Sequence, residues 1–502
     1  MPVKAILAFL LLLIAGVSPL FADEIPSTNQ EGTIFTLWPL IDYRSSPREG
    51  YSNLSILGPL FKFQWRGEER DLAVRPFFYN TSNSREETSK TSYLYPIASS
   101  EKSRDTETAQ ILKLYQDNNY RKGEEGKQRD RMLFPFYISG KSRKYGPYTS
   151  VFPFYGDLYE RFWRDEYHYV MFPLYSRTVK NGTTSRNYLY PLVSTLEGDK
   201  ESGFQIWPIY GQSAKEGVYN KRFVLWPVYM EEDTGLDTVN PTHAFNLFPF
   251  YTSSESPNRS SRHYMWPFFG HTVDRAKKSE EWDYFWPFLV TVRGESRNMN
   301  RYIPFYSEDR RKENLKQWYM WPLYSHEELL SASFKQERDR ILYFLYSDNE
   351  ETWSLDGKSR RRVALWPLFT YKRDERGMHT FAFPAPIEPI VDREGIEKVW
   401  SPLWRLYVHK WNDDDDSAVS VLWNLYWHEH RKEDLAFELF PLVAYSSERR
   451  FTDFALFKGL FRYRQNETDK SVSFFWLPFG IHWGKSAADG AERGQVNPRS
   501  KQ

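Results

Sequence analysis

Residues 284–292 read YFWPFLVTV, and closely related stretches recur along the chain. They include TLWPLIDY (36–43), MLFPFYIS (132–139), VLWPVYME (224–231) and YMWPLYSH (319–326). The consensus is an aliphatic residue, an aromatic residue, proline, an aliphatic residue or Phe, and then Tyr or Phe. Aromatic and β-branched residues favour strands, whereas proline cannot donate to a β-ladder. The position of this proline relative to the strands therefore decides the architecture.

The motif recurs about every 19 residues, which gives about 24 units. Fifteen of its prolines directly follow Trp, Phe or Tyr. The anchor prolines are Pro39, Pro59, Pro76, Pro96, Pro135, Pro153, Pro173, Pro191, Pro208, Pro227, Pro249, Pro267, Pro287, Pro304, Pro322, Pro367, Pro384, Pro402, Pro441 and Pro478. Four further units have the motif without proline and begin at Leu112, Leu342, Leu422 and Leu456.

This period is too short for helical repeats, and its composition favours strands. Polar stretches such as SSEKSRDTE (99–107) separate the motifs and are typical of turns. Each period therefore predicts one strand of about 8 to 12 residues and one turn, in an all-β antiparallel meander of about 24 strands. We expect residues 23–483 to form a single β-repeat domain, followed by a polar, disordered tail at 484–502.

The N-terminus predicts export. Lys4 precedes an apolar run from Ala5 to Val17, and Ala22 stands before the acidic Asp23. This is typical of a signal peptide over residues 1–22 with cleavage after Ala22. An uncleaved anchor is the alternative, which the short run and Pro19 disfavour.

Composition narrows the function classes. The chain has no cysteine, which excludes disulfides and thiolate metal sites. Removal of Lys4 with the signal peptide leaves 66 of the 67 basic residues against 66 acidic ones. The charges are interspersed, so the basic surface expected of a nucleic-acid-binding protein is lacking, and no nucleic-acid partner is predicted.

Two architectures remain open. Export, strand number and the alternation of residues 282–293 and 418–428 favour a large outer-membrane β-barrel. We expect Val290 and Val292 to share a face with Trp282, and Val419 to share a face with Trp427. Proline inside a lipid-exposed strand opposes a barrel, because it leaves a carbonyl without a partner. The alternative is a soluble β-solenoid or propeller-like array in which proline marks a bend or corner.

The repeat resembles that of uncharacterised exported bacterial proteins rich in Trp-Pro-Leu-Tyr motifs, over essentially the whole mature chain. This resemblance implies no activity. At the level of class, the chain resembles outer-membrane β-barrels, which implies lipid and the barrel-assembly machinery as partners. We therefore expect a non-enzymatic outer-membrane barrel acting as a pore, transporter or structural component. The alternative is a soluble periplasmic or surface protein that binds a polymer or protein partner.

Few residues suggest chemistry. His428 and His430 stand two apart and could share a metal, although a polar strand end is the simpler interpretation. Asp413 to Asp416 could attract calcium, but the run lacks spaced ligands and fits a solvated turn. The repeated aromatic residues could stack on ligands or fill the core. We therefore predict no catalytic, cofactor-binding or metal-binding residues, no cofactor and no enzymatic activity.

Overall fold

The computed structural model describes residues 33–46, 50–120, 128–142, 144–391, 394–448, 451–467, 469–476 and 480–484. These residues form 46 strands of five to eight residues in one antiparallel sheet, with very little helix. The all-β, antiparallel prediction is therefore confirmed. No strand pairing among the described residues closes the sheet into a barrel. The predicted signal peptide, Pro478 and nearly all of the predicted tail lie outside the described residues.

The chain divides into two compact units. Unit 1 comprises residues 1–72 and 406–502, and unit 2 comprises residues 73–405. β5 (Glu69–Val74) crosses the boundary. The other strands of unit 1 are β1 (Thr33–Leu37), β2 (Ile41–Ser46), β3 (Tyr51–Ile56), β4 (Phe61–Arg66), β38 (Tyr407–Trp411), β39 (Ser417–Val421), β40 (Tyr426–Arg431), β41 (Asp434–Leu439), β42 (Val443–Glu448), β43 (Phe451–Leu456), β44 (Phe461–Gln465), β45 (Asp469–Phe474) and β46 (Gly480–Gly484), with a 3-10 turn η3 (Phe457–Gly459).

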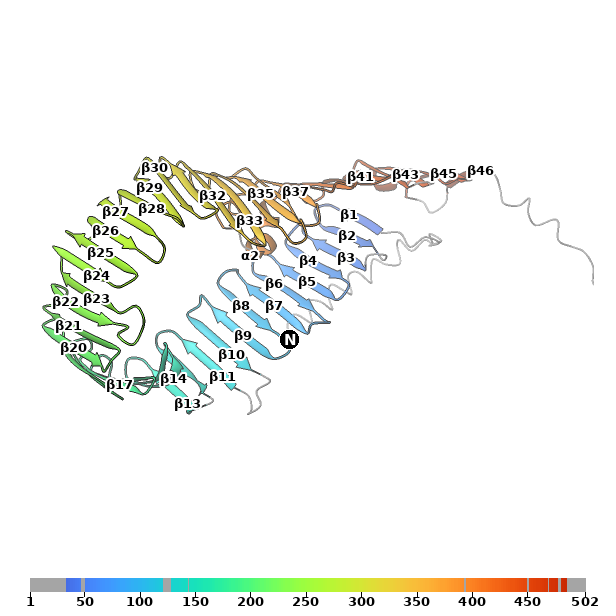
Figure 1. The fold of residues 1–502 in the computed structure, drawn as a ribbon. Coiled ribbons are helices and arrows are strands. Elements are labelled where there is room, and N and C mark those ends of the chain that lie inside the picture. Colours follow the sequence, from blue (N-terminus) through green and yellow to red (C-terminus); the bar gives the residue numbers. More distant parts are fainter. Residues whose placement is uncertain are drawn as a thin grey trace, which may run out of the picture. The chain divides into compact units, whose positions relative to one another are not determined.

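Unit 2 is a long run of short strands. Figure 1 shows them side by side in a single curved layer. They are β6 (Phe78–Asn83), β7 (Thr88–Tyr93), β8 (Ala98–Lys102), β9 (Thr106–Ile111), β10 (Tyr115–Tyr120), β11 (Gln128–Leu133), β12 (Tyr137–Ser142), β13 (Gly146–Val151), β14 (Tyr155–Arg161), β15 (Arg164–Val170), β16 (Tyr175–Lys180), β17 (Thr183–Tyr188), β18 (Val193–Gly198), β19 (Glu201–Ile206), β20 (Tyr210–Lys215), β21 (Tyr219–Val224), β22 (Tyr229–Thr234), β23 (Thr242–Leu247), β24 (Tyr251–Glu255), β25 (Arg259–Tyr264), β26 (Phe269–Asp274), β27 (Ser279–Phe285), β28 (Leu289–Gly294), β29 (Arg297–Tyr302), β30 (Tyr306–Arg311), β31 (Asn314–Tyr319), β32 (Tyr324–Ser331), β33 (Phe334–Ile341), β34 (Tyr346–Trp353), β35 (Ser359–Leu365), β36 (Phe369–Arg373) and β37 (His379–Phe383), followed by α2 (Glu394–Val399) and α3 (Ser401–Trp404).

The prediction of one strand per period was wrong, because each period contains two strands. The aromatic–proline motif is itself the turn between them. In the first repeat, β1 ends at Leu37 and β2 begins at Ile41, and these two residues pair across the turn. The Leu40 amide donates to the Leu37 carbonyl at 2.8 Å. Proline needs no ladder partner in a turn, so its missing N–H costs no strand hydrogen bond.

The motif turns and the polar turns alternate along the chain. A representative polar turn is Asn181-Gly182, which joins β16 to β17 with Lys180 opposite Thr183. Both turn residues have positive φ, 49° for Asn181 and 80° for Gly182. This is the backbone that two-residue hairpins require and that Asn-Gly adopts readily. Because each motif turn is followed by a polar turn, the two kinds of turn fall on opposite edges of the sheet.

The predicted faces also need correction. Val290 pairs with Asp283 and Val292 pairs with Glu281, so both valines share a face with these acids and not with Trp282. In the same way, Val419 pairs with His428 and not with Trp427. The alternation was counted straight through the motif, whereas the chain reverses there and restarts it.

Two motif prolines depart from the turn pattern, and a third, Pro478, lies outside the described residues. Pro384 follows β37 and opens a helical insertion. Pro402 occupies the first turn of α3, a position that tolerates proline because the first helical amides have no partner. The insertion replaces one motif turn, and the strand order resumes at β38.

Unit 1 contains two packed groups of strands. The Trp38 indole Nε1–H, from the β1–β2 turn, donates to the Leu422 carbonyl at 2.8 Å. Gly58, in the β3–β4 turn, has positive φ, and a Cβ there would lie 3.7 Å from Trp423. Turns from the beginning and from the end of the chain therefore pack against each other, which fixes the N-terminal hairpins on the C-terminal ones.

Candidate functional site: the apolar turn edge

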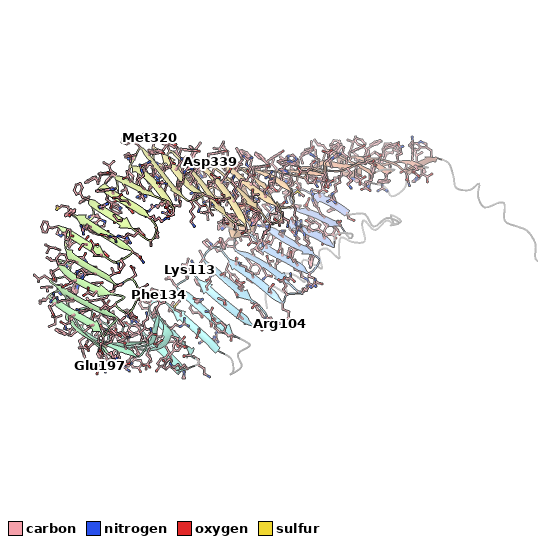
Figure 2. All side chains as sticks on the ribbon, in the orientation of Figure 1. Arg104, Lys113, Phe134, Glu197, Met320 and Asp339 are labelled. Carbon is pink, nitrogen blue, oxygen red and sulfur yellow. The ribbon has the colours of Figure 1, made fainter. Side chains whose placement is uncertain are left out.

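The motif turns line one edge of the sheet, which we call the motif edge. In unit 2 it is formed by the turns that follow the odd-numbered strands β5 to β35, and the polar turns form the opposite, polar edge. Figure 2 shows Lys113 and Phe134 at one end of their strands and Arg104 at the opposite end. Lys113 and Phe134 belong to motif turns, whereas Arg104 belongs to a polar turn.

The motif edge exposes large apolar side chains in almost every turn. The residue after the proline is the most regular of these. Its exposed fraction in unit 2 is 65% for Phe77, 60% for Phe136, 59% for Phe154, 51% for Leu174, 58% for Ile209, 61% for Phe250, 62% for Phe305 and 47% for Leu323 and Leu368. Monomeric soluble proteins rarely expose contiguous apolar patches larger than a few hundred Å². The motif edge of unit 2 instead repeats an exposed apolar group from turn to turn.

The aromatic residues before the prolines contact one another along this edge. The ring centroids of Trp207 and Trp226, from successive motif turns, are 5.6 Å apart. Those of Phe248 and Trp266 are 5.7 Å apart. Such offset pairs each stabilise the structure by about 0.5–1.5 kcal/mol beyond area burial. Successive turns are therefore held in line, which keeps the apolar edge continuous.

Ion pairs replace aromatic contacts away from the motif edge. Lys221 on β21 contacts Glu232 on β22 at 3.2 Å. Arg361 on β35 contacts Asp348 on β34 at 2.6 Å. Each such cross-strand pair stabilises by about 0.2–1 kcal/mol. These hairpins therefore combine an apolar end at the motif edge with charged side chains further along their strands.

The helical insertion joins the two ends of unit 2. We call residues 385–405 the latch. Val399 is 1% exposed and packs on Ala73 and Tyr79 at the start of the unit. The Trp400 indole Nε1–H donates to the Tyr95 carbonyl at 2.8 Å, and Arg75 Nε donates to the Lys398 carbonyl at 2.8 Å.

The other side of the latch binds the last strands of unit 2. Arg362 on β35 donates to the Glu388 carbonyl at 2.7 Å. Lys372 on β36 lies 2.5 Å from one oxygen of Glu397, and Arg405 lies 2.7 Å from the other. The run of strands in unit 2 therefore leaves from, and returns to, the same helical segment.

The charges of the latch are partly buried. Glu388 is 1% exposed and accepts from the Trp404 indole at 3.1 Å and from Arg405 at 3.3 Å. Burial of Glu397 opposes its ionisation, but the positive charges of Arg405 and Lys372 outweigh burial and hold the pKa of Glu397 below its usual range. Removal of an acid from such a group leaves cations without compensation.

The histidines considered as metal ligands have other neighbours. His430 Nδ1 lies 3.0 Å from the Asp415 carbonyl oxygen, and His428 Nδ1 lies 3.3 Å from the Tyr426 hydroxyl. Glu429 between them contacts Arg44 at 2.5 Å. Within the described ranges, no group of three or more His, Asp or Glu side chains is placed to hold a metal ion.

The acidic run 413–416 forms a polar turn between β38 and β39. The Asn412 side-chain oxygen accepts from the amides of Asp414 and Asp416, at 3.1 and 2.9 Å. Asp415 has a φ of 64°. This geometry is that of an Asn-capped hairpin turn, because the side chain of Asn mimics a backbone acceptor.

No family model matches this chain, and no curated protein matches it. Among the described residues, no helix is both long and apolar enough to cross a membrane.

Sequence reasoning found the motif but not the motif edge. The signal was present, because the residues flanking the proline are apolar on both sides, whereas a turn in a soluble protein is usually polar. The latch carried no such signal, because Pro384 and Pro402 are spaced like the other motif prolines. Its partners stand about 300 residues earlier in the chain, so no local pattern identifies them.

Proposed function

We propose that this protein is a non-enzymatic structural component of the outer membrane, held at the lipid surface by its motif edge. The observation that carries the proposal is the regular exposure of a large apolar residue after the motif prolines. Inserting side chains of this type into the boundary between headgroups and acyl chains removes apolar area from water.

The dimensions of the hairpins favour insertion by the edge over spanning. At about 3.3 Å per residue, strands of this length reach roughly 17–26 Å. A barrel that spans the outer membrane needs an outward apolar band about 25 Å tall. Here the half of the β21–β22 hairpin next to the polar edge carries the ion pair Lys221–Glu232. The apolar end alone has the depth of about 5–10 Å that interfacial binding requires.

Tryptophan and tyrosine support this placement. Both residues concentrate at membrane interfaces, where an apolar ring and a polar tip suit the headgroup region. Trp207, Trp226 and Trp266 stand before motif prolines, and tyrosines such as Tyr175 and Tyr251 begin the strands that follow motif turns. A soluble β-repeat protein that binds a protein partner through the same edge is the second candidate.

Vesicle flotation of the folded, purified mature protein tests the proposal. We expect it to float with phosphatidylcholine vesicles and to be released by detergent. Triple replacement of Phe154, Phe250 and Phe305 by Ser removes side chains that are 59%, 61% and 62% exposed. Each contributes about 2–3 kcal/mol when buried in lipid, so vesicle binding should weaken at least about a hundredfold.

The matched control replaces Trp163, Val239 and Leu355 by Ser. These residues are 90%, 96% and 90% exposed, and they stand in turns at the opposite edge of the sheet. We expect this variant to bind vesicles as the unaltered protein does. Equal loss in both triple variants would contradict the proposal, and so would a folded wild-type protein that stays entirely with the soluble fraction. The latter result would favour the soluble candidate.

A further inference from the structure

Unit 1 contains a cleft that is separate from the motif edge of unit 2. The strands β2–β4 face the strands β38–β42, and between the two groups lies a space of about 740 Å³. Its lining includes Arg44, Tyr51 and Arg66 from the first group and Ser420 and Glu429 from the second. Ligand pockets commonly have volumes of about 300–1,000 Å³. The cleft is therefore large enough for a small molecule.

Arg44 connects the two walls. Its Nη1 lies 2.5 Å from Glu429 and its Nε lies 3.1 Å from Asp42. The guanidinium also lies over the Trp427 ring, 4.9 Å from the ring centroid. The remaining nitrogen, Nη2, is buried and has no hydrogen-bond partner among the described residues. A buried donor without a partner costs about 1–3 kcal/mol, so this atom is a favourable position for an acceptor.

Arg66 supplies a second guanidinium. It lies over the Tyr51 ring, 5.6 Å from the ring centroid, and it forms no ion pair with any residue that the structure describes. Burial raises the pKa of the Tyr51 hydroxyl; the charges of Arg44 and Arg66 lower it, and those of Asp42 and Glu429 raise it. The lining of the cleft contains four cations, including Arg44 and Arg66, together with three acids and the Tyr51 phenol.

Arg44 is already paired with Asp42 and Glu429, so Arg66 supplies the uncompensated positive charge of the cleft. Glu429 is shared between Arg44 at 2.5 Å and Arg431 at 3.8 Å. We propose that the cleft binds a small oxyanion, a phosphate or carboxylate group, between Arg44 and Arg66. Guanidinium groups bind such oxygens through charge-assisted and bidentate hydrogen bonds. The Tyr51 ring would pack against the remainder of the ligand. This site is independent of the proposed attachment to lipid.

Arg66→Gln is the variant that tests the site, because Arg66 is exposed and its loss breaks no ion pair with a described residue. Arg44 is unsuitable because it also connects the walls. Isothermal titration calorimetry of the mature protein with inorganic phosphate and with succinate should show saturable binding. Arg66→Gln should weaken it about tenfold or more, the effect of one lost charge-assisted hydrogen bond. Arg104→Gln, which alters an exposed arginine in a polar turn of unit 2, should leave binding unchanged.

A second experiment separates a free anion from a lipid headgroup. Vesicles with and without phosphatidylglycerol are compared for the wild type and for Arg66→Gln. A preference for phosphatidylglycerol that disappears in Arg66→Gln assigns the site to a lipid phosphate, whereas binding of only the soluble anions assigns it to a free ligand. The triple Phe→Ser variant of the motif edge should keep its anion binding. Equal affinity in wild type and Arg66→Gln overturns the proposal, as does the absence of saturable binding to all three probes.

Discussion

Glu397→Gln tests whether the latch holds the two ends of unit 2 together. Glu397 lies 2.5 Å from Lys372 and 2.7 Å from Arg405, and its side chain is 22% exposed. Loss of its charge leaves two cations facing an uncharged amide. Breaking a buried ion pair by removing one partner costs about 3–5 kcal/mol, and the residual exposure of Glu397 places the expected cost near about 3 kcal/mol.

Glu394→Gln provides a matched control on the same helix. Glu394 lies 2.6 Å from Lys398, one helical turn away, but its side chain is 73% exposed. Solvent screens such a pair, and its loss should cost only about 0.3–0.5 kcal/mol. The two variants remove the same charge from the same helix, so they differ chiefly in the burial of the pair.

Amide hydrogen exchange of α2 and α3 measures the effect. A loss of about 3 kcal/mol in the free energy of local opening should reduce protection in the latch about a hundredfold in Glu397→Gln. The amides of the central strands, such as β20 and β21, should keep their protection. Equal protection of the latch in Glu397→Gln and Glu394→Gln would refute the reasoning.

The pKa of Glu397 gives the same prediction a pH dependence. Because the folded-state pKa is lower than the unfolded value of about 4.3, the carboxylate stabilises the latch at any pH above that value. This contribution is lost as the pH falls through the folded-state pKa. Latch protection in the wild type should therefore decline below about pH 4, and Glu397→Gln should lack this component of the decline.

Two further predictions concern the strands of unit 2. Met299→Ala should lower the free energy of unfolding by about 2–5 kcal/mol, because Met299 is 2% exposed and packs on Val290 and Val292. Denaturant titration measures this loss. An effect below about 1 kcal/mol would show that this cluster stabilises little. Burial and the 2.5 Å hydrogen bond to Glu201 raise the pKa of Tyr219 to about 12. In Glu201→Gln, spectrophotometric titration should therefore show one tyrosine that ionises at lower pH than in the wild type. Superimposable titration curves of the two proteins would contradict this.

The period and the strand content could be predicted from sequence because they depend on local composition. The number of strands could not be predicted, because the same apolar residues occur in strands and in apolar turns. In YFWPFLVTV, Phe285 ends β27 and Leu289 begins β28, and only their pairing shows that Trp286 to Phe288 lie in a turn. A turn is usually recognised by its polarity, and these turns are apolar because they form the motif edge.

The candidate sites depended still more on distant contacts. Arg44 and Glu429 are separated by 385 residues in the sequence, and Trp400 and Tyr95 are separated by 305. Neither pair has a sequence pattern of its own. His428 and His430, which do form a local pattern, contact the Tyr426 hydroxyl and the Asp415 carbonyl oxygen.

By itself, the sequence determined that this protein is an antiparallel β-structure with a repeat of aromatic, proline and aliphatic residues, because strand propensity and period are properties of neighbouring residues. Only the tertiary structure decided that proline stands at the turns, that one edge of the sheet is apolar, and that a helical latch joins the ends of unit 2. The physical reason is that pairing register and long-range packing determine where the chain reverses and which side chains remain exposed. A local pattern that is shared by strands and apolar turns does not distinguish these outcomes.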